Sequence, residues 1–408
     1  MKSRILLSAA LAIMVLFAGC HKPQQIKKYD RQLPPGELAL RKITNPADLP
    51  DLTAGCYDFT GLRLAIDNSL DYLKKPSSKK FFPYGKISHQ QAVDSLKAFR
   101  KLLDSGSRGA RLNTDILTQF DVYISVGCDD VGTVLFTGYY TPIFDGSPVR
   151  TERFRYPLYK QPEDLLKGPN GEILGKRGAN NQTTLYPPRA ELENSGELKG
   201  KELIWLGDPF EVYIAHVQGS AKIRMPDGKL ATVGYAANNG HEYKSVAEAL
   251  VADGKMPRDK MSLSAMIDYF RKNPGEVAPY TQRNPRFVFF RTEGGEPRGS
   301  INEPVTPMRT IATDKSIFPR ACLAFISTKL PQATANEISI QPYDGFVLDQ
   351  DTGGAIRAPG RCDVYMGQGD IAGKMAGQTY QEGKVYYLFL KPEYQSVVPS
   401  SEPPKSQQ

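Results

Sequence analysis

Short apolar stretches rich in β-branched and aromatic residues recur along the chain and predict a mainly β protein with a few helices. Seven stretches have the length of strands: residues 133–140, 210–218, 222–225, 286–291, 323–327, 345–348 and 384–391. The segment Pro226-Asp227-Gly228-Lys229 is a hairpin turn signal. Strands and helices do not alternate regularly, which disfavours a doubly wound parallel sheet. Many short strands between turns favour barrels.

Apolar residues at helical spacing predict four helices. One covers residues 58–75, and a second follows Ser88, which forms a capping box with Gln91. A third begins near Ser245, and the fourth covers residues 262–272 before Pro274.

The first nineteen residues have the pattern of a secretion signal. Two basic residues precede an apolar run at 5–18, which as a helix would span roughly 21 Å, short of the ~30 Å hydrocarbon core of a membrane. Small residues lead directly to Cys20, so we expect a lipoprotein signal at 1–19 and acylation of Cys20. An ordinary signal peptide with an incidental cysteine is the alternative. We expect a tether at 20–44, a disordered tail at 398–408, and about two domains between them.

A lipidated Cys20 without a following aspartate predicts the periplasmic face of the outer membrane in a Gram-negative cell. The net charge of +8 suits an acidic partner, and peptidoglycan carries carboxylates on its stem peptides. No nucleic-acid motif is present, and a monomer is expected because there is no coiled-coil pattern.

The four remaining cysteines permit either two disulfides or buried free thiols: Cys56, Cys128, Cys322 and Cys362.

Two aspartates near the C-terminus are the strongest candidates for chemistry. Asp351 and Asp363 lie twelve positions apart, each among apolar residues and glycines. An ionised aspartate in such surroundings is either a hydrogen-bonding hub or an acid with a shifted pKa. Gly353 and Gly354 leave room for a ligand near the backbone. Turn formation by Asp before Gly-Gly is the alternative.

Other chemistries lack their motifs. The histidines are not at zinc spacing, and neither HExxH nor GxSxG occurs, so no metal or organic cofactor is expected. Gly367-Gln368-Gly369 is a fragment of a dinucleotide fingerprint without an expected helix. Aromatic, hydroxyl and amide side chains near glycines are typical of sugar sites, and we expect substrate binding by Thr137, Tyr139, Tyr140, Gln218, Gly219 and Ser220. Strand core and simple turns are the alternatives.

An ordered series of motifs resembles the family of membrane-bound lytic murein transglycosylase A over roughly residues 130–370. The matching segments are 136–142 (FTGYYTP), 217–220 (VQGS), 234–236 (GYA), 239–241 (NGH), 284–290 (NPRFVFF) and the block 351–367, which is similar to the three-aspartate domain. The resemblance implies a double-psi β-barrel built from residues 45–142 and 291–397. It also implies a smaller β-rich domain inserted at 143–290, with glycan in the groove between the two.

The same resemblance implies lytic cleavage of the β-1,4 bond between N-acetylmuramic acid and N-acetylglucosamine, with a 1,6-anhydromuramyl product. It assigns the catalytic acid to Asp363 and a supporting role to Asp351, with no cofactor. Thr137 and Tyr139 match groove residues, and Gln218 and Ser220 match more weakly. Arg361, Cys362 and Asp349 depart from the family pattern. A peptidoglycan-binding lipoprotein without catalysis is the alternative, and enzymes of cell-wall synthesis are further candidate partners.

Overall fold

The computed structural model describes residues 27–169, 171–178, 182–334 and 337–395. The predicted signal sequence, Cys20 and the predicted tail at 398–408 lie outside these residues. Among the described residues, no helix is both long enough and apolar enough to cross a membrane.

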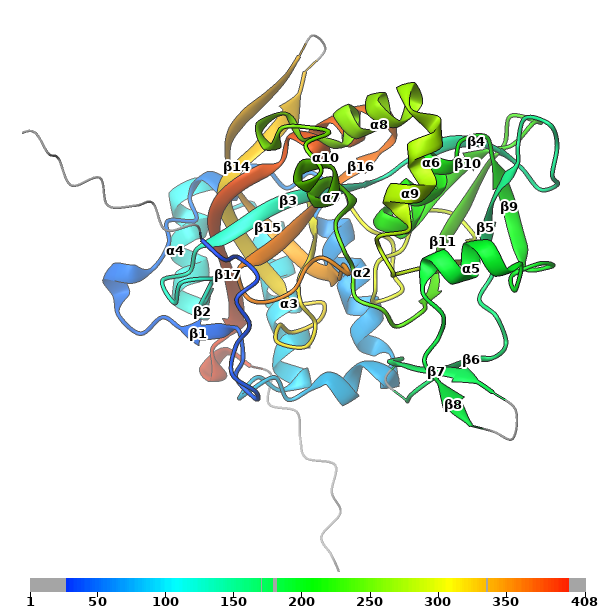
Figure 1. Cartoon of the computed structure of the whole chain (residues 1–408). Helices are drawn as coiled ribbons and strands as arrows, with labels where there is room; N and C mark the ends of the chain where they lie inside the picture. Colours follow the sequence, from blue (N-terminus) through cyan, green and yellow to red (C-terminus); the bar gives the residue numbers. More distant parts are fainter. Residues whose placement is uncertain (1–26, 170, 179–181, 335–336, 396–408) are drawn as a thin grey trace, which may run out of the picture.

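The centre of the molecule is a closed six-stranded barrel (Figure 1). Its strand order is β17-β14-β15-β13-β16-β3, and an additional pairing of β17 with β3 closes the ring. The strands are β3 (Val134–Thr141), β13 (Thr310–Ala312), β14 (Leu323–Ala333), β15 (Ile338–Asp351), β16 (Arg361–Gln368) and β17 (Tyr380–Leu390). Closure leaves few unpaired backbone groups at sheet edges. The predicted mainly β barrel is confirmed.

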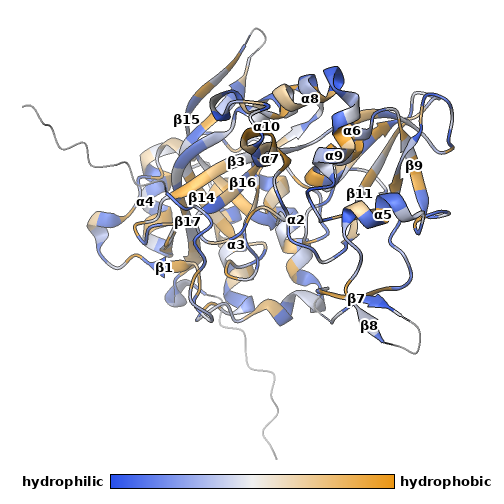
Figure 2. Cartoon of the chain, viewed as in Figure 1, coloured by the Kyte–Doolittle hydropathy of each residue, from blue (hydrophilic) through white to orange (hydrophobic). Residues whose placement is uncertain are grey.

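Two further strands and four helices pack on the barrel. The strands, β1 (Leu40–Lys42) and β2 (Phe120–Ser125), extend the sheet from β17. The helices are α2 (Leu62–Lys74), α3 (His89–Asp104), α4 (Gly109–Gln119) and α10 (Gly369–Gln378). Figure 2 shows apolar residues along β3 in the barrel. Part of the expected tether at 20–44 belongs to the folded body. Strand β1 lies within this segment and pairs with β2, and the Tyr29 hydroxyl donates to Glu382 over 2.6 Å.

A second sheet lies beside the barrel, in the order β12-β11-β10-β4-β9-β5. Its strands are β4 (Ile143–Ser147), β5 (Tyr156–Tyr159), β9 (Glu202–Leu206), β10 (Ser220–Arg224), β11 (Leu230–Asn238) and β12 (Val288–Glu293). A small sheet next to it contains β6 (Leu165–Lys167), β7 (Ile173–Arg177) and β8 (Thr183–Thr184). The associated helices are α5 (Arg189–Ser195), α6 (Pro209–Gln218), α7 (Val246–Ala252), α8 (Leu263–Lys272) and α9 (Val277–Thr281).

The four predicted helices are present as α2, α3, α7 and α8, although α2 begins at Leu62 and not at residue 58. Ser88 accepts a hydrogen bond from Gln91 N at the start of α3, and Ser245 accepts one from Glu248 N at the start of α7. The predicted hairpin turn joins β10 to β11, with Gly228 in the left-handed region at φ 81°.

The predicted strand at 210–218 is wrong, because these residues form helix α6. The Asp208 side chain accepts from Phe210 N, and Pro209 occupies the first turn, where its missing N–H costs nothing. Phe210, Tyr213 and Ile214 have helical spacing and share one buried cluster. The absence of a helix after Gly367-Gln368-Gly369 is also wrong, since α10 begins at Gly369.

Candidate active site

Three polar residues predicted to act together lie in one row across the barrel. Ala312 of β13 is in register with Asp351 of β15 on one side and with Asp363 of β16 on the other. Asp363 is in turn in register with Thr137 of β3. Residues in register on neighbouring strands project to the same face. The two aspartates are therefore separated by two strand spacings, about 10 Å between Cα atoms.

Asp363 is a partly buried carboxyl group with one free oxygen. Its Oδ1 accepts a short hydrogen bond from the Thr137 hydroxyl, whereas its Oδ2 has no hydrogen-bond partner in the described part of the chain. Burial raises the pKa of Asp363, and this effect outweighs the opposing influences of Thr137 and the Arg361 cation. A carboxyl group with a raised pKa and a free oxygen can carry a proton and donate it.

Asp351 has the opposite arrangement, because both of its oxygens accept hydrogen bonds. Oδ1 accepts from the backbone N–H groups of Ser300 and Thr352, each over 2.8 Å. Oδ2 accepts from the Tyr139 hydroxyl over 2.8 Å. Burial raises the pKa of Asp351 to about 6 even though these bonds lower it. The three donors favour the anion of Asp351, the form in which its Oδ2 orients the Tyr139 hydroxyl.

A line of contacts runs from Tyr139 to the second sheet. The Tyr139 ring lies 5.2 Å from the ring of Tyr365, centre to centre. The Tyr365 hydroxyl is 2.9 Å from Thr141 Oγ1, which is 3.4 Å from Ser220 Oγ. This line brings the predicted residue Ser220 to the end of β3.

The side chain of Gln218 contacts the backbone of Tyr140. Gln218 Oε1 accepts from Tyr140 N over 3.0 Å, and Gly219 ends helix α6 in the left-handed region at φ 76°. The Tyr140 ring itself is buried, 6% exposed, and a side chain at Gly373 of α10 would contact it. Of the two neighbouring tyrosines, Tyr139 is therefore the one whose hydroxyl reaches the aspartate row.

One glycine of the predicted pair, Gly354, faces an arginine that the sequence did not single out. Gly354 lies in the turn after β15, where an added Cβ would be 3.0 Å from Nε of Arg286. The absence of a side chain thus allows Arg286, from the loop before β12, to approach the segment that carries Asp351.

Two residues that depart from the family pattern are structural. Asp349 is fully buried and forms an ion pair with Lys315, with further hydrogen bonds from Thr313 and the Tyr387 hydroxyl. Cys362 is buried beneath the row.

All four cysteines in the described residues are buried free thiols, so the alternative of two disulfides is not the one that the structure has.

Comparison with known proteins identifies the family. The family model described as the MltA specific insert domain matches residues 135–291, and that of the 3D domain matches 309–389. Membrane-bound lytic murein transglycosylase A of Escherichia coli strain K12 is 31% identical over 277 residues, which are 67% of this chain and 70% of the relative. The chain belongs to the membrane-bound lytic murein transglycosylase A family.

Other members of this transglycosylase family are similar to the chain over most of its length. The Vibrio cholerae protein of the same name is 28% identical over 354 residues, covering 84% of this chain and 90% of the relative. The crystal structure of E. coli MltA with bound chitohexaose has a TM-score of 0.67 at 26% identity, covering 90% of this chain and all of that one. A structure from Agrobacterium tumefaciens, at 23% identity and a TM-score of 0.71, covers 86% of this chain and 98% of its own and supports the fold. The chain is accordingly an enzyme, a peptidoglycan lytic transglycosylase.

Proposed function

We propose that this enzyme cleaves the β-1,4 bond between N-acetylmuramic acid and N-acetylglucosamine without water and leaves a 1,6-anhydromuramyl end. The observation that carries the proposal is the free Oδ2 of Asp363, on a carboxyl group whose pKa is raised by burial. The chitohexaose bound to the E. coli relative supports a glycan ligand.

Asp363 acts twice in this reaction. Its proton passes to the glycosidic oxygen as the bond from that oxygen to C1 of the muramic acid breaks. The resulting carboxylate then accepts the proton of the C6 hydroxyl, whose oxygen attacks C1 of the same sugar. The acid is regenerated, and no water molecule is consumed.

One carboxyl group is sufficient because the nucleophile belongs to the substrate. Most glycosidases need two carboxylates, since an external water or an enzyme group attacks the sugar. An internal hydroxyl has a high effective molarity. Asp351 then has a supporting role: its anion holds the Tyr139 hydroxyl. Gln218, Gly219, Ser220, Gly353 and Gly354 complete the proposed substrate-binding set, and Tyr140 contributes through its backbone.

Digestion of purified sacculi tests the reaction type. We expect mass spectrometry to find fragments with anhydromuramyl ends. Reducing ends would instead indicate a hydrolase, and intact glycan would indicate a binding protein.

The pH profile of cleavage tests the role of Asp363 through its neighbour. The acid must be protonated, so the rate falls as pH rises through the pKa of Asp363. The Arg361 cation lowers that pKa. Arg361→Gln therefore raises it, and the basic limb of kcat against pH moves to higher pH. An unchanged basic limb, or a shift to lower pH, would contradict this assignment.

We also propose that acyl chains on Cys20 anchor the enzyme at the periplasmic face of the outer membrane. The relatives are named membrane-bound, which supports a membrane location. Each buried methylene contributes about 0.8 kcal/mol, so several chains bind firmly. Cys20→Ala is expected to move the enzyme from the membrane fraction to the soluble periplasmic fraction. Retention in the membrane would contradict the lipid anchor.

A further inference from the structure

Arg361 is a cation beside the acid without a carboxylate partner. It lies two residues before Asp363 on strand β16, so both side chains project to the same face. One of its nitrogens, Nη2, donates to Thr137 Oγ1 over 3.3 Å, and Thr137 in turn donates to Asp363. Its Nε is buried and unpartnered. Arg361 also acts electrostatically on Tyr243 in the loop before α7. This loop belongs to the inserted region, which here means residues 135–291, matched by the insert-domain model. The guanidinium therefore lies where barrel and inserted region meet.

Arg286 is a second such cation and lies against the turn that follows Asp351. Its guanidinium lies against Gly354, and Nη1 donates to the carbonyl of His241 over 3.0 Å. Neither Arg286 nor Arg361 lies within 4.0 Å of a carboxylate among the described residues. Because a guanidinium has five N–H donors, both retain unused donors for a ligand.

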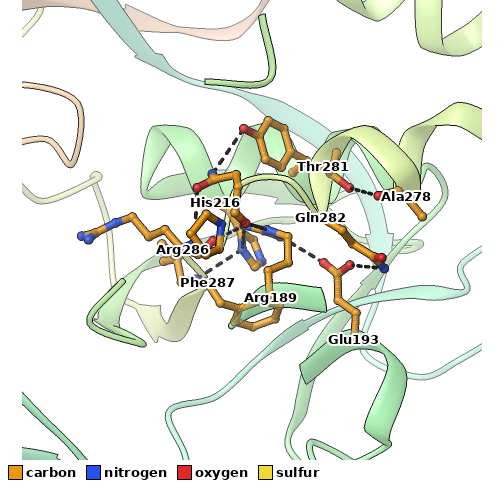
Figure 3. Close-up of polar contacts among 12 residues, drawn as sticks. Arg189, Glu193, His216, Ala278, Thr281, Gln282, Arg286 and Phe287 are labelled. Atoms are coloured by element: carbon orange, nitrogen blue, oxygen red, sulfur yellow. Dashed lines mark hydrogen bonds and ion pairs between the residues drawn. The ribbon is translucent and has the colours of Figure 1, made fainter. Parts of the chain in front are cut away.

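A buried network holds the backbone that carries Arg286. Arg189 is 1% exposed; its Nη2 donates to the Arg286 carbonyl over 2.7 Å and contacts His216 Nδ1 at 3.1 Å. Asn284 Oδ1 accepts from Arg286 N over 3.2 Å. Figure 3 shows the Arg286 side chain extending away from this cluster. A fixed backbone with a projecting, unpaired guanidinium is a prepared site for an anion.

We propose that Arg361 and Arg286 each bind a carboxylate of the muramyl glycan, so that the enzyme prefers muramyl glycan to neutral chito-oligosaccharide. This inference rests on the proposed function. Each carboxylate is either that of a 3-O-lactyl group or one on the peptide attached to it. Muramic acid, the sugar whose C1 is attacked next to the aspartate row, carries both. A guanidinium recognises either as a bidentate acceptor, whereas N-acetylglucosamine oligomers contain no anion.

Binding can be measured without cleavage. The full-length protein with Asp363→Asn is titrated calorimetrically with three tetrasaccharides: chitotetraose, a peptide-free GlcNAc–MurNAc tetrasaccharide and its peptide-bearing form. Arg361→Gln and Arg286→Gln are each added to this background. We expect each to weaken binding of a muramyl ligand about ten-fold, the effect of losing one charge-assisted hydrogen bond, and of chitotetraose by no more than about two-fold. Arg361→Lys should retain part of the preference, because it keeps the charge.

The three ligands identify the carboxylate. A loss with the peptide-free ligand indicates the lactyl group, and a loss confined to the peptide-bearing ligand indicates the peptide; either result supports the proposal. Arg224→Gln is the control, since Arg224 is an arginine of the inserted region already paired with Asp145 over 2.9 Å. It should change none of the three affinities.

Equal losses for all three ligands, or no loss, would overturn the proposal. If a variant fails to fold, the Asp363→Asn protein alone still decides, because added salt must weaken muramyl binding more than chitotetraose binding. A salt effect equal for both ligands would likewise overturn the proposal. The ligands are checked for cleavage by mass spectrometry, so failure of the Asp363 assignment is seen separately from failure of the arginine assignment.

Discussion

Asp363→Asn is expected to abolish formation of anhydromuramyl ends while glycan binding persists. The amide cannot give a proton to the leaving oxygen or accept one from the C6 hydroxyl. Since general acid–base catalysis contributes about 10²–10⁴-fold for one transfer, the loss of both roles should lower kcat by at least about 10³-fold. The measurement is anhydromuramyl product released from sacculi over time, with binding to chitohexaose followed in parallel.

The control for this variant is Asp370→Asn. Asp370 is an exposed aspartate in the first turn of α10, and among the described residues it has no hydrogen bond or ion pair to Asp351, Asp363 or Thr137. The Asp370→Asn variant should form anhydromuramyl ends at a rate within about two-fold of the unaltered enzyme, since surface substitutions have small effects. If Asp363→Asn made anhydro ends at the rate of the unaltered enzyme, another group would have to be the acid.

Lys315→Met is expected to destabilise the barrel by about 3 kcal/mol, because breaking a buried ion pair leaves one charge uncompensated. The Lys315 side chain is 4% exposed and its partner Asp349 is fully buried. Thr313 and Tyr387 still donate to Asp349 after the change, but neither supplies a positive charge. Urea unfolding followed by circular dichroism measures the free energy of unfolding.

Lys27→Met is the matched control for this pair. Lys27 pairs with Glu382 on the surface, where the two side chains are 42% and 43% exposed. Exposed ion pairs contribute about 0–1 kcal/mol. Equal unfolding free energies for the two variants would show that the buried pair contributes no more than the surface pair.

Local signals in the sequence were reliable wherever a few neighbouring residues decide the conformation. The caps at Ser88 and Ser245 and the turn at Gly228 depend on side chains and backbone within three positions. The strand prediction at residues 210–218 was wrong because it gave more weight to the number of apolar residues in the segment than to their spacing. Phe210, Tyr213 and Ile214 repeat at three and four positions, and Asp208 with Pro209 is a start signal.

The candidate site was predicted in its composition but not in its arrangement. Thr137, Tyr139, Asp351 and Asp363 were all named from motifs, and the structure brings them together. Arg286 was not singled out, because an arginine within an aromatic strand-like stretch carries no signal of its own. Its place beside Gly354 depends on a contact across 68 positions of the chain.

The sequence alone determined the strand-rich composition, the helix starts at Ser88 and Ser245, the family and the choice of two candidate aspartates, since these follow from residue types and short spacings. Only the tertiary structure decided that the short strand β13, some forty residues earlier, lies between Asp351 and Asp363. It also decided which carboxyl group keeps a free oxygen. The physical reason is that pairing between distant strands is set by closure of the barrel and burial of its core, and no local pattern of residues records either.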